Sequence, residues 1–182
     1  MLARGLVTCA LLAGCTREPA EAICPEAGTG AIVVTEVRGD QDATGPWVEL
    51  YNTSNQTLDL EGTRVRFRRR DGTSEVKVLI RRNLDIAAGG FAVLGLFPDD
   101  DRPAYVDYGF AGDYQETWRS STVIDLEACE TSLDRLIIDS LPDDGTYSLG
   151  VRPENAETND LPENWCTDLD GTPGSPNFRC PE

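Results

Sequence analysis

The chain has 182 residues, enough for one domain of ordinary size with a substantial core. Its 32 acidic residues outnumber its 16 basic ones, and the net charge of −16 disfavours nucleic acid and anionic lipid surfaces as partners. It contains no histidine, which excludes Ser-His-Asp and Cys-His catalysis and histidine-ligated zinc.

The N-terminus predicts a signal peptide over residues 1–14. A single basic residue, Arg4, precedes an apolar stretch that is too short to span a bilayer. The sequence Leu12-Ala13-Gly14-Cys15 has the small residues of a bacterial lipobox, so we expect lipidation at Cys15. The alternative is an ordinary signal peptide followed by a chance cysteine. Position +2 is Thr16 rather than Asp, which predicts an outer-membrane lipoprotein, facing either the periplasm or the cell surface.

Residues 15–30 are polar and contain Pro and Gly, so we expect a tether before a single domain over residues 31–178. In that domain, apolar residues alternate with polar ones in short segments separated by turn residues, and no segment has helical periodicity. Many short strands of this kind predict an all-β sandwich. The predicted strands are Ala31–Val37, Trp47–Tyr51, Arg64–Arg69, Glu75–Ile80, Phe91–Leu96, Thr122–Leu126, Arg135–Ile138 and Tyr147–Val151.

The region from residue 98 to about 132 begins with an irregular, Pro-, Asp- and Gly-rich stretch. We expect a long surface insertion there.

Four cysteines remain once Cys9 leaves with the signal and Cys15 takes lipid. An even number in an exported chain predicts two disulfides, with three possible connectivities. We favour Cys24–Cys180, which would join the two ends of the domain, and Cys129–Cys166, which would fix the insertion to the C-terminal segment.

Four stretches of the chain together resemble the lamin-tail domain family. They are Ile32-Val33-Val34-Thr35-Glu36-Val37, then Trp47-Val48-Glu49-Leu50-Tyr51-Asn52 with Leu58-Asp59-Leu60-Glu61-Gly62, then Leu84-Asp85-Ile86-Ala87-Ala88-Gly89-Gly90-Phe91, and finally Asn164-Trp165 with Gly171-Thr172-Pro173-Gly174-Ser175-Pro176-Asn177. The resemblance implies an immunoglobulin-like sandwich that serves as a binding or interaction module. The insertion and the extra cysteines depart from the family pattern.

Two groups of acidic residues are candidates for chemistry. Glu36 and Glu49 on adjacent strands form a possible carboxylate pair for acid–base catalysis or cation binding, or else they accept hydrogen bonds from loop amides and fix the register of the sandwich. The stretches Asp168-Leu169-Asp170-Gly171 and Asp99-Asp100-Asp101 are candidates for calcium, or are solvated turns, since neither matches a full EF-hand loop. We expect no cofactor otherwise.

The hairpin at residues 64–82 concentrates eight of the 16 bases against only Asp71 and Glu75. Guanidinium groups suit carboxylate or phosphate ligands, so Arg64, Arg66, Arg68 and Lys77 are the candidate binding residues. The alternative is that these bases pair with the protein's own acids or lie solvated.

These features predict a lipid-anchored cell-envelope module that binds or scaffolds and has no catalytic activity of its own. Its expected partners are the membrane, through the lipid, and an envelope polymer or protein, but not nucleic acid. The alternative is a carboxylate-dependent hydrolase acting on envelope glycans.

Overall fold

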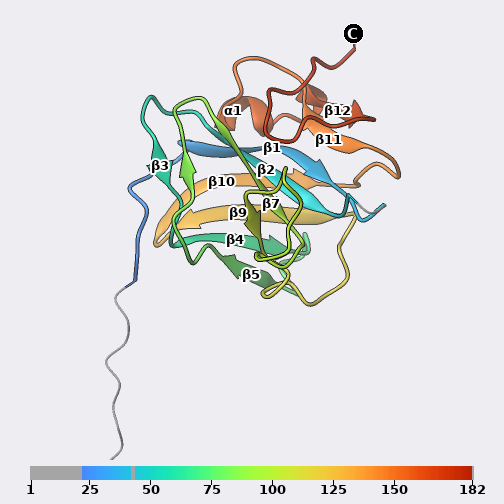
Figure 1. Cartoon of the computed structure of the whole chain (residues 1–182). Coiled ribbons are helices and arrows are strands. Elements are labelled where there is room, and N and C mark those ends of the chain that lie inside the picture. Colours follow the sequence, from blue (N-terminus) through green and yellow to red (C-terminus); the bar gives the residue numbers. More distant parts are fainter. Residues whose placement is uncertain (1–21, 42–43, 182) are drawn as a thin grey trace, which may run out of the picture.

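A computed structural model describes residues 22–41 and 44–181, and they form a β-sandwich with very little helix (Figure 1). The larger sheet has the strand order β12-β11-β1-β2-β7-β8. Its strands are β1 (Ile32–Arg38), β2 (Trp47–Asn52), β7 (Phe91–Gly95), β8 (Tyr108–Gly109), β11 (Thr146–Leu149) and β12 (Trp165–Asp168). Neighbouring strands are antiparallel except β7 and β8, which are parallel.

The smaller sheet packs against the larger one, with the strand order β10-β9-β4-β5. Its strands are β10 (Thr131–Ile138), β9 (Thr122–Ala128), β4 (Thr63–Arg68) and β5 (Val76–Leu79). A short ribbon of β3 (Leu58–Asp59) and β6 (Asp85–Ile86), the helical turn α1 (Ala156–Asn159) and the 3-10 turn η1 (Pro162–Asn164) complete the fold. The predicted all-β sandwich is therefore confirmed. Within the described residues, no helix is both long and apolar enough to cross a membrane.

Strand β4 shows how the sequence dictates the two layers. Val65 and Phe67 are buried between the sheets, whereas the arginines that alternate with them stay half-buried on the outer face. This period of two arises because successive side chains of a strand point to opposite faces of the sheet. Burial of apolar side chains in this way supplies most of the stabilisation of such a domain, at roughly 25 cal/mol per Å².

The expected insertion is present as an irregular loop, but its aromatic side chains belong to the core. The ring of Phe67 lies 5.8 Å from that of Phe110, 5.4 Å from that of Tyr114 and 5.3 Å from that of Trp118, between centroids. All four rings are buried. The loop therefore closes one end of the sandwich rather than lying only on its surface.

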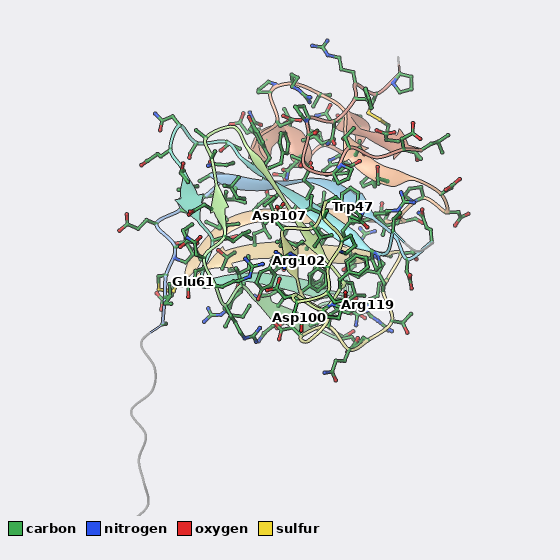
Figure 2. All side chains as sticks on the ribbon, viewed as in Figure 1. Trp47, Glu61, Asp100, Arg102, Asp107 and Arg119 are labelled. Carbon is green, nitrogen blue, oxygen red and sulfur yellow. A yellow bond between two sulfur atoms is a disulfide. The ribbon has the colours of Figure 1, made fainter. Side chains whose placement is uncertain are left out.

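Another part of the same loop covers the outer face of the larger sheet. Trp47 projects from β2 and forms a small buried cluster with Val93 and Val106 (Figure 2). Phe97 and Tyr105 pack against this cluster. The larger sheet is thus shielded from water on both faces beneath this loop.

The signal peptide, Cys9, Cys15 and the first part of the expected tether lie outside the described residues. Its last part, residues 22–30, lies against the domain. Thr29 Oγ1 donates to the carbonyl of Ser132 at 2.9 Å, and the amide of Gly30 donates to the carbonyl of Leu133 at 2.7 Å. The chain also passes closely over Gly62, where an added Cβ would lie 2.1 Å from the carbonyl oxygen of Ile23.

All four expected cysteines form disulfides, but the favoured pairing is wrong. The bonds are Cys24–Cys129, with Cα atoms 5.5 Å apart, and Cys166–Cys180, with Cα atoms 5.7 Å apart. The chain enters the domain beside the turn between β9 and β10, which contains Cys129. The C-terminal segment instead returns to β12 and contacts Gly150, so Cys180 meets Cys166 and is remote from Cys24.

Loss of the first disulfide is expected to destabilise the domain more than loss of the second. The Cys24–Cys129 bond closes a loop with a sequence separation of 105 and the other a loop of 14. The chain-entropy model gives about 4.7 kcal/mol for the longer loop and about 3 kcal/mol for the shorter one. Thermal melting of the double variants Cys24→Ser/Cys129→Ser and Cys166→Ser/Cys180→Ser checks this order, and an equal or reversed loss would contradict it.

Candidate functional site

Glu36 and Glu49 are brought together, as the sequence predicts, on the outer face of the larger sheet. They are cross-strand partners in the β1–β2 ladder, next to a β-bulge between Val34 and Glu36. A bulge changes which side chains share a face, and here it aligns the two glutamates. Both are fully buried.

The C-terminal segment around residues 171–177 covers Glu36. Oε1 of Glu36 accepts hydrogen bonds from the hydroxyls of Thr146 and Ser148 on β11, the latter at 2.6 Å. Its Oε2 accepts from the backbone amide of Thr172 at 3.1 Å. Two hydroxyls from the sheet and one amide from the loop therefore satisfy this carboxylate.

Glu49 binds the same segment further along. Its Oε1 accepts from the hydroxyl of Thr35 at 2.8 Å and its Oε2 from the amide of Gly174 at 2.7 Å. At the end of the segment, the side-chain amide of Asn177 donates to the carbonyl of Thr35 at 2.7 Å. We call residues 171–177 the closing segment, because they close the outer face over the acid pair.

The environment of the pair favours protonation. Burial raises the pKa of Glu36, against the lowering effect of its hydrogen bonds to Ser148, Thr146 and Thr172. Burial, together with the negative charge of Glu36, raises the pKa of Glu49 to about 8. The geometry matches the structural interpretation of the pair, in which both buried glutamates accept hydrogen bonds from loop amides.

A third buried carboxylate, Asp134 on β10, joins the two sheets and was not singled out from the sequence. Its Oδ2 accepts from the amide of Val34 on β1 at 2.8 Å and from the amide nitrogen of Asn159 in α1 at 2.8 Å. Val34 lies beside the bulge, beyond the stretch of β1 that β11 pairs with. Asp134 therefore satisfies a backbone donor at the point where the ladder stops.

In each candidate calcium stretch, one aspartate accepts hydrogen bonds from the chain itself. Asp99 pairs with Arg82 through both carboxylate oxygens, at 2.8 Å each, and the hydrogen bonds to Arg82 are the main reason its pKa falls to about 2. Asp168 accepts from the amide of Asp170 at 3.1 Å, as in a turn. No group of three His, Cys, Asp or Glu residues suited to a metal ion occurs in residues 22–41 and 44–181.

The candidate binding residues of the hairpin gather on one face, where most face acids of the same sheet. Arg66 pairs with both Glu75 and Glu127. Arg68 pairs with Asp125 at 2.6 Å. The remaining two candidates are less engaged: Lys77 is 64% exposed and lies 2.9 Å from Glu75, and Arg64 reaches the carbonyl of Cys129 at 3.5 Å. A ligand for this face stays a prediction, and it would compete with these carboxylates.

The sequence matches no protein-family model and no curated protein.

Neutralising Glu49 is expected to flatten the pH dependence of stability. Because the pKa of Glu49 rises from 4.5 to about 8 on folding, the folded chain binds the proton more tightly, and stability falls as pH rises through that window. Glu49→Gln cannot ionise, so it should retain on the order of 1–3 kcal/mol at pH 9 that the unmodified chain loses.

Chemical denaturation at pH 5 and pH 9 measures this effect. The matched control is Glu130→Gln, an exposed glutamate in the β9–β10 turn, which should keep the pH dependence of the unmodified chain. The same pH dependence in Glu49→Gln and Glu130→Gln would show that Glu49 does not bind a proton on folding.

Proposed function

We propose that the chain is an outer-membrane lipoprotein, anchored through Cys15, whose immunoglobulin-like, lamin-tail-like sandwich acts as a binding or scaffold module in the cell envelope. The observation that carries the proposal is the Cys24–Cys129 disulfide. It fastens the chain to the sandwich only a few residues beyond the lipobox cysteine. Two disulfides also suit an exported chain, because the cytosol keeps thiols reduced.

The position of the disulfide supports an anchoring role. Residues 16–21 separate Cys15 from the first described residue, a stretch that spans at most about 25 Å when fully extended. In this proposal the domain is held close to the lipid, and the β9–β10 turn is the part of the sandwich to which the entering chain is bonded. A pull on the anchor is transmitted to the β9–β10 turn through Cys24.

The contacts of the four family-like stretches support a lamin-tail-like domain. Asn52, which ends the Trp47–Asn52 stretch, donates to the carbonyls of Ile86 and Ala87 in the third stretch, at 2.8 and 3.1 Å. Glu36 and Glu49, from the first two stretches, bind the closing segment of the fourth. The residues that carry the resemblance thus contact one another in space.

The engagement of the acid pair favours binding over hydrolysis. A glycan hydrolase needs two carboxyl groups that reach its substrate. Here both carboxylates are covered by the closing segment and accept hydrogen bonds from it. We therefore propose a module that recognises its partner through loops and strand faces rather than one that cleaves it.

Metabolic labelling with an alkyne fatty acid tests the anchor. The full chain, expressed in a two-membrane bacterium, should take up the label, and Cys15→Ser should abolish the labelling. Cys9→Ser is the matched control and should label normally, since Cys9 lies within the signal peptide. Absence of label from the unmodified chain, or retention of it in Cys15→Ser, would rule out the lipoprotein.

A further inference from the structure

Three arginines surround a shallow hollow at the tip of the β4–β5 hairpin. Arg69 and Arg70 follow β4, and Arg119 precedes β9. Together with Asp71, Ser120 and Ser121 they line a hollow of about 430 Å³. Such a concentration of cations is unexpected in a chain with a net charge of −16.

Some guanidinium N–H groups of the arginines that line this hollow have no hydrogen-bond partner within the described residues. Arg69 makes no side-chain hydrogen bond or ion pair with any described residue, in contrast to Arg66 and Arg68 on the same hairpin. Arg119 pairs with Glu116 through Nη2, but its buried Nη1 has no partner within the described part of the chain. The exposed guanidinium of Arg69 is therefore the donor that an anion in the hollow reaches directly, whereas Nη1 of Arg119 is shielded from solvent as the side chain lies.

Cations outnumber acids three to one in the lining of the hollow. The one acid that lines it, Asp71, already accepts from the amide and hydroxyl of Thr73 at 2.9 and 2.6 Å. These bonds to Thr73, with a smaller contribution from Arg69, lower the pKa of Asp71. A phosphoryl group has three acceptor oxygens and matches several guanidinium donors at once.

A second pocket, of about 280 Å³, shares Arg70 with the hollow. Its apolar walls include Ile137, which is 52% exposed, and Tyr147, which stacks on Trp165 with ring centroids 4.8 Å apart. Asp139 and Asp160 supply acceptors. Asn159 also lines the pocket, and its buried Oδ1 has no partner among residues 22–41 and 44–181.

The two cavities differ in what they accept. Carboxylates beside an apolar wall suit a hydroxylated ring, since hydroxyl groups donate to them and C–H faces pack on the aromatic side chain. The same carboxylates repel a phosphate, which the arginine side attracts. Arg70, ion-paired with Asp139, stands between the two.

We propose that this double cavity binds a phosphorylated saccharide, with the phosphoryl group among Arg69, Arg70 and Arg119 and the sugar ring against Tyr147. This specifies a ligand for the binding module proposed above, but the site itself does not depend on the lipid anchor.

The location of the hollow separates it from the end at which the chain enters. Thr63 pairs with Ala128 at one end of the smaller sheet, next to Cys129, whereas Arg68 pairs with Val123 at the other end. Figure 2 shows Glu61 and Arg119 at these opposite ends. The hollow therefore lies at the opposite end of the smaller sheet from the Cys24–Cys129 bond.

Calorimetry with glucose 1-phosphate, on the whole disulfide-bonded chain at constant ionic strength, tests the proposal. Glucose 1-phosphate should bind, inorganic phosphate more weakly and glucose not detectably. Arg69→Ser should weaken binding about tenfold, because it removes a charged donor pair. Arg69 is exposed, so the variant should fold, and Arg119→Lys provides a second, charge-conserving probe of the same hollow.

Arg179→Ser is the discriminating control. Arg179 is an exposed cation near the C-terminus that does not line the hollow, so its loss should leave binding unchanged. Equal weakening by Arg179→Ser and Arg69→Ser, or no binding of glucose 1-phosphate, would overturn the proposal. So would binding of phosphatidylglycerol vesicles that Arg69→Ser abolishes, because that result assigns the hollow to a lipid headgroup.

These results are independent of the lipidation test. Binding of glucose 1-phosphate that Arg69→Ser weakens supports the site even if Cys15 carries no lipid. Labelling at Cys15 without any binding would retain the anchor and remove this ligand.

Discussion

Glu36 and Glu49, which are buried on the outer face of the larger sheet, need hydrogen-bond donors. The C-terminal half of the chain supplies most of these donors. A carboxylate removed from water has to find hydrogen-bond donors, or remain protonated, because the free energy of burying it alone is prohibitive. Glu36 and Glu49 find donors in the hydroxyls of β1 and β11 and in the amides of the closing segment. The closing segment, although it has no regular structure, is thereby part of the core.

The same requirement explains why the C-terminus needs its own disulfide. The closing segment makes polar contacts with the sheet but contains no large apolar side chain to bury, and Phe178, just beyond it, is 66% exposed. The Cys166–Cys180 bond holds the chain on β12 after it leaves Asn177. At the other end of the domain, Cys24–Cys129 fixes the entering chain to the smaller sheet. Each disulfide thus secures a segment that lacks a strand partner.

Local features of the sequence predicted eight strands, because side-chain alternation is a property of a few neighbouring residues, but they missed the short strands β3, β6, β8 and β12. The β4 segment and the acid pair on adjacent strands follow from this alternation.

Contacts between segments that are far apart in the sequence were not predicted. Asp125, which pairs with Arg68, and Glu127, one of the two acids that pair with Arg66, lie 57 and 61 residues away on β9. The disulfide pairing depends on where the two ends of the chain lie in space, and Asp134 looks like any other acid in an alternating strand. The aromatic side chains of the insertion have no period that marks them as buried.

Amide hydrogen exchange at Thr172 and Gly174 tests most directly whether the acid pair holds the closing segment as part of the core. Both amides donate to the buried carboxylates, so they should exchange as slowly as amides of the β1–β2 ladder and open only with the domain. Exchange at the rate of an exposed loop would contradict this account, because the closing segment would then leave Glu36 and Glu49 open to solvent and to a substrate.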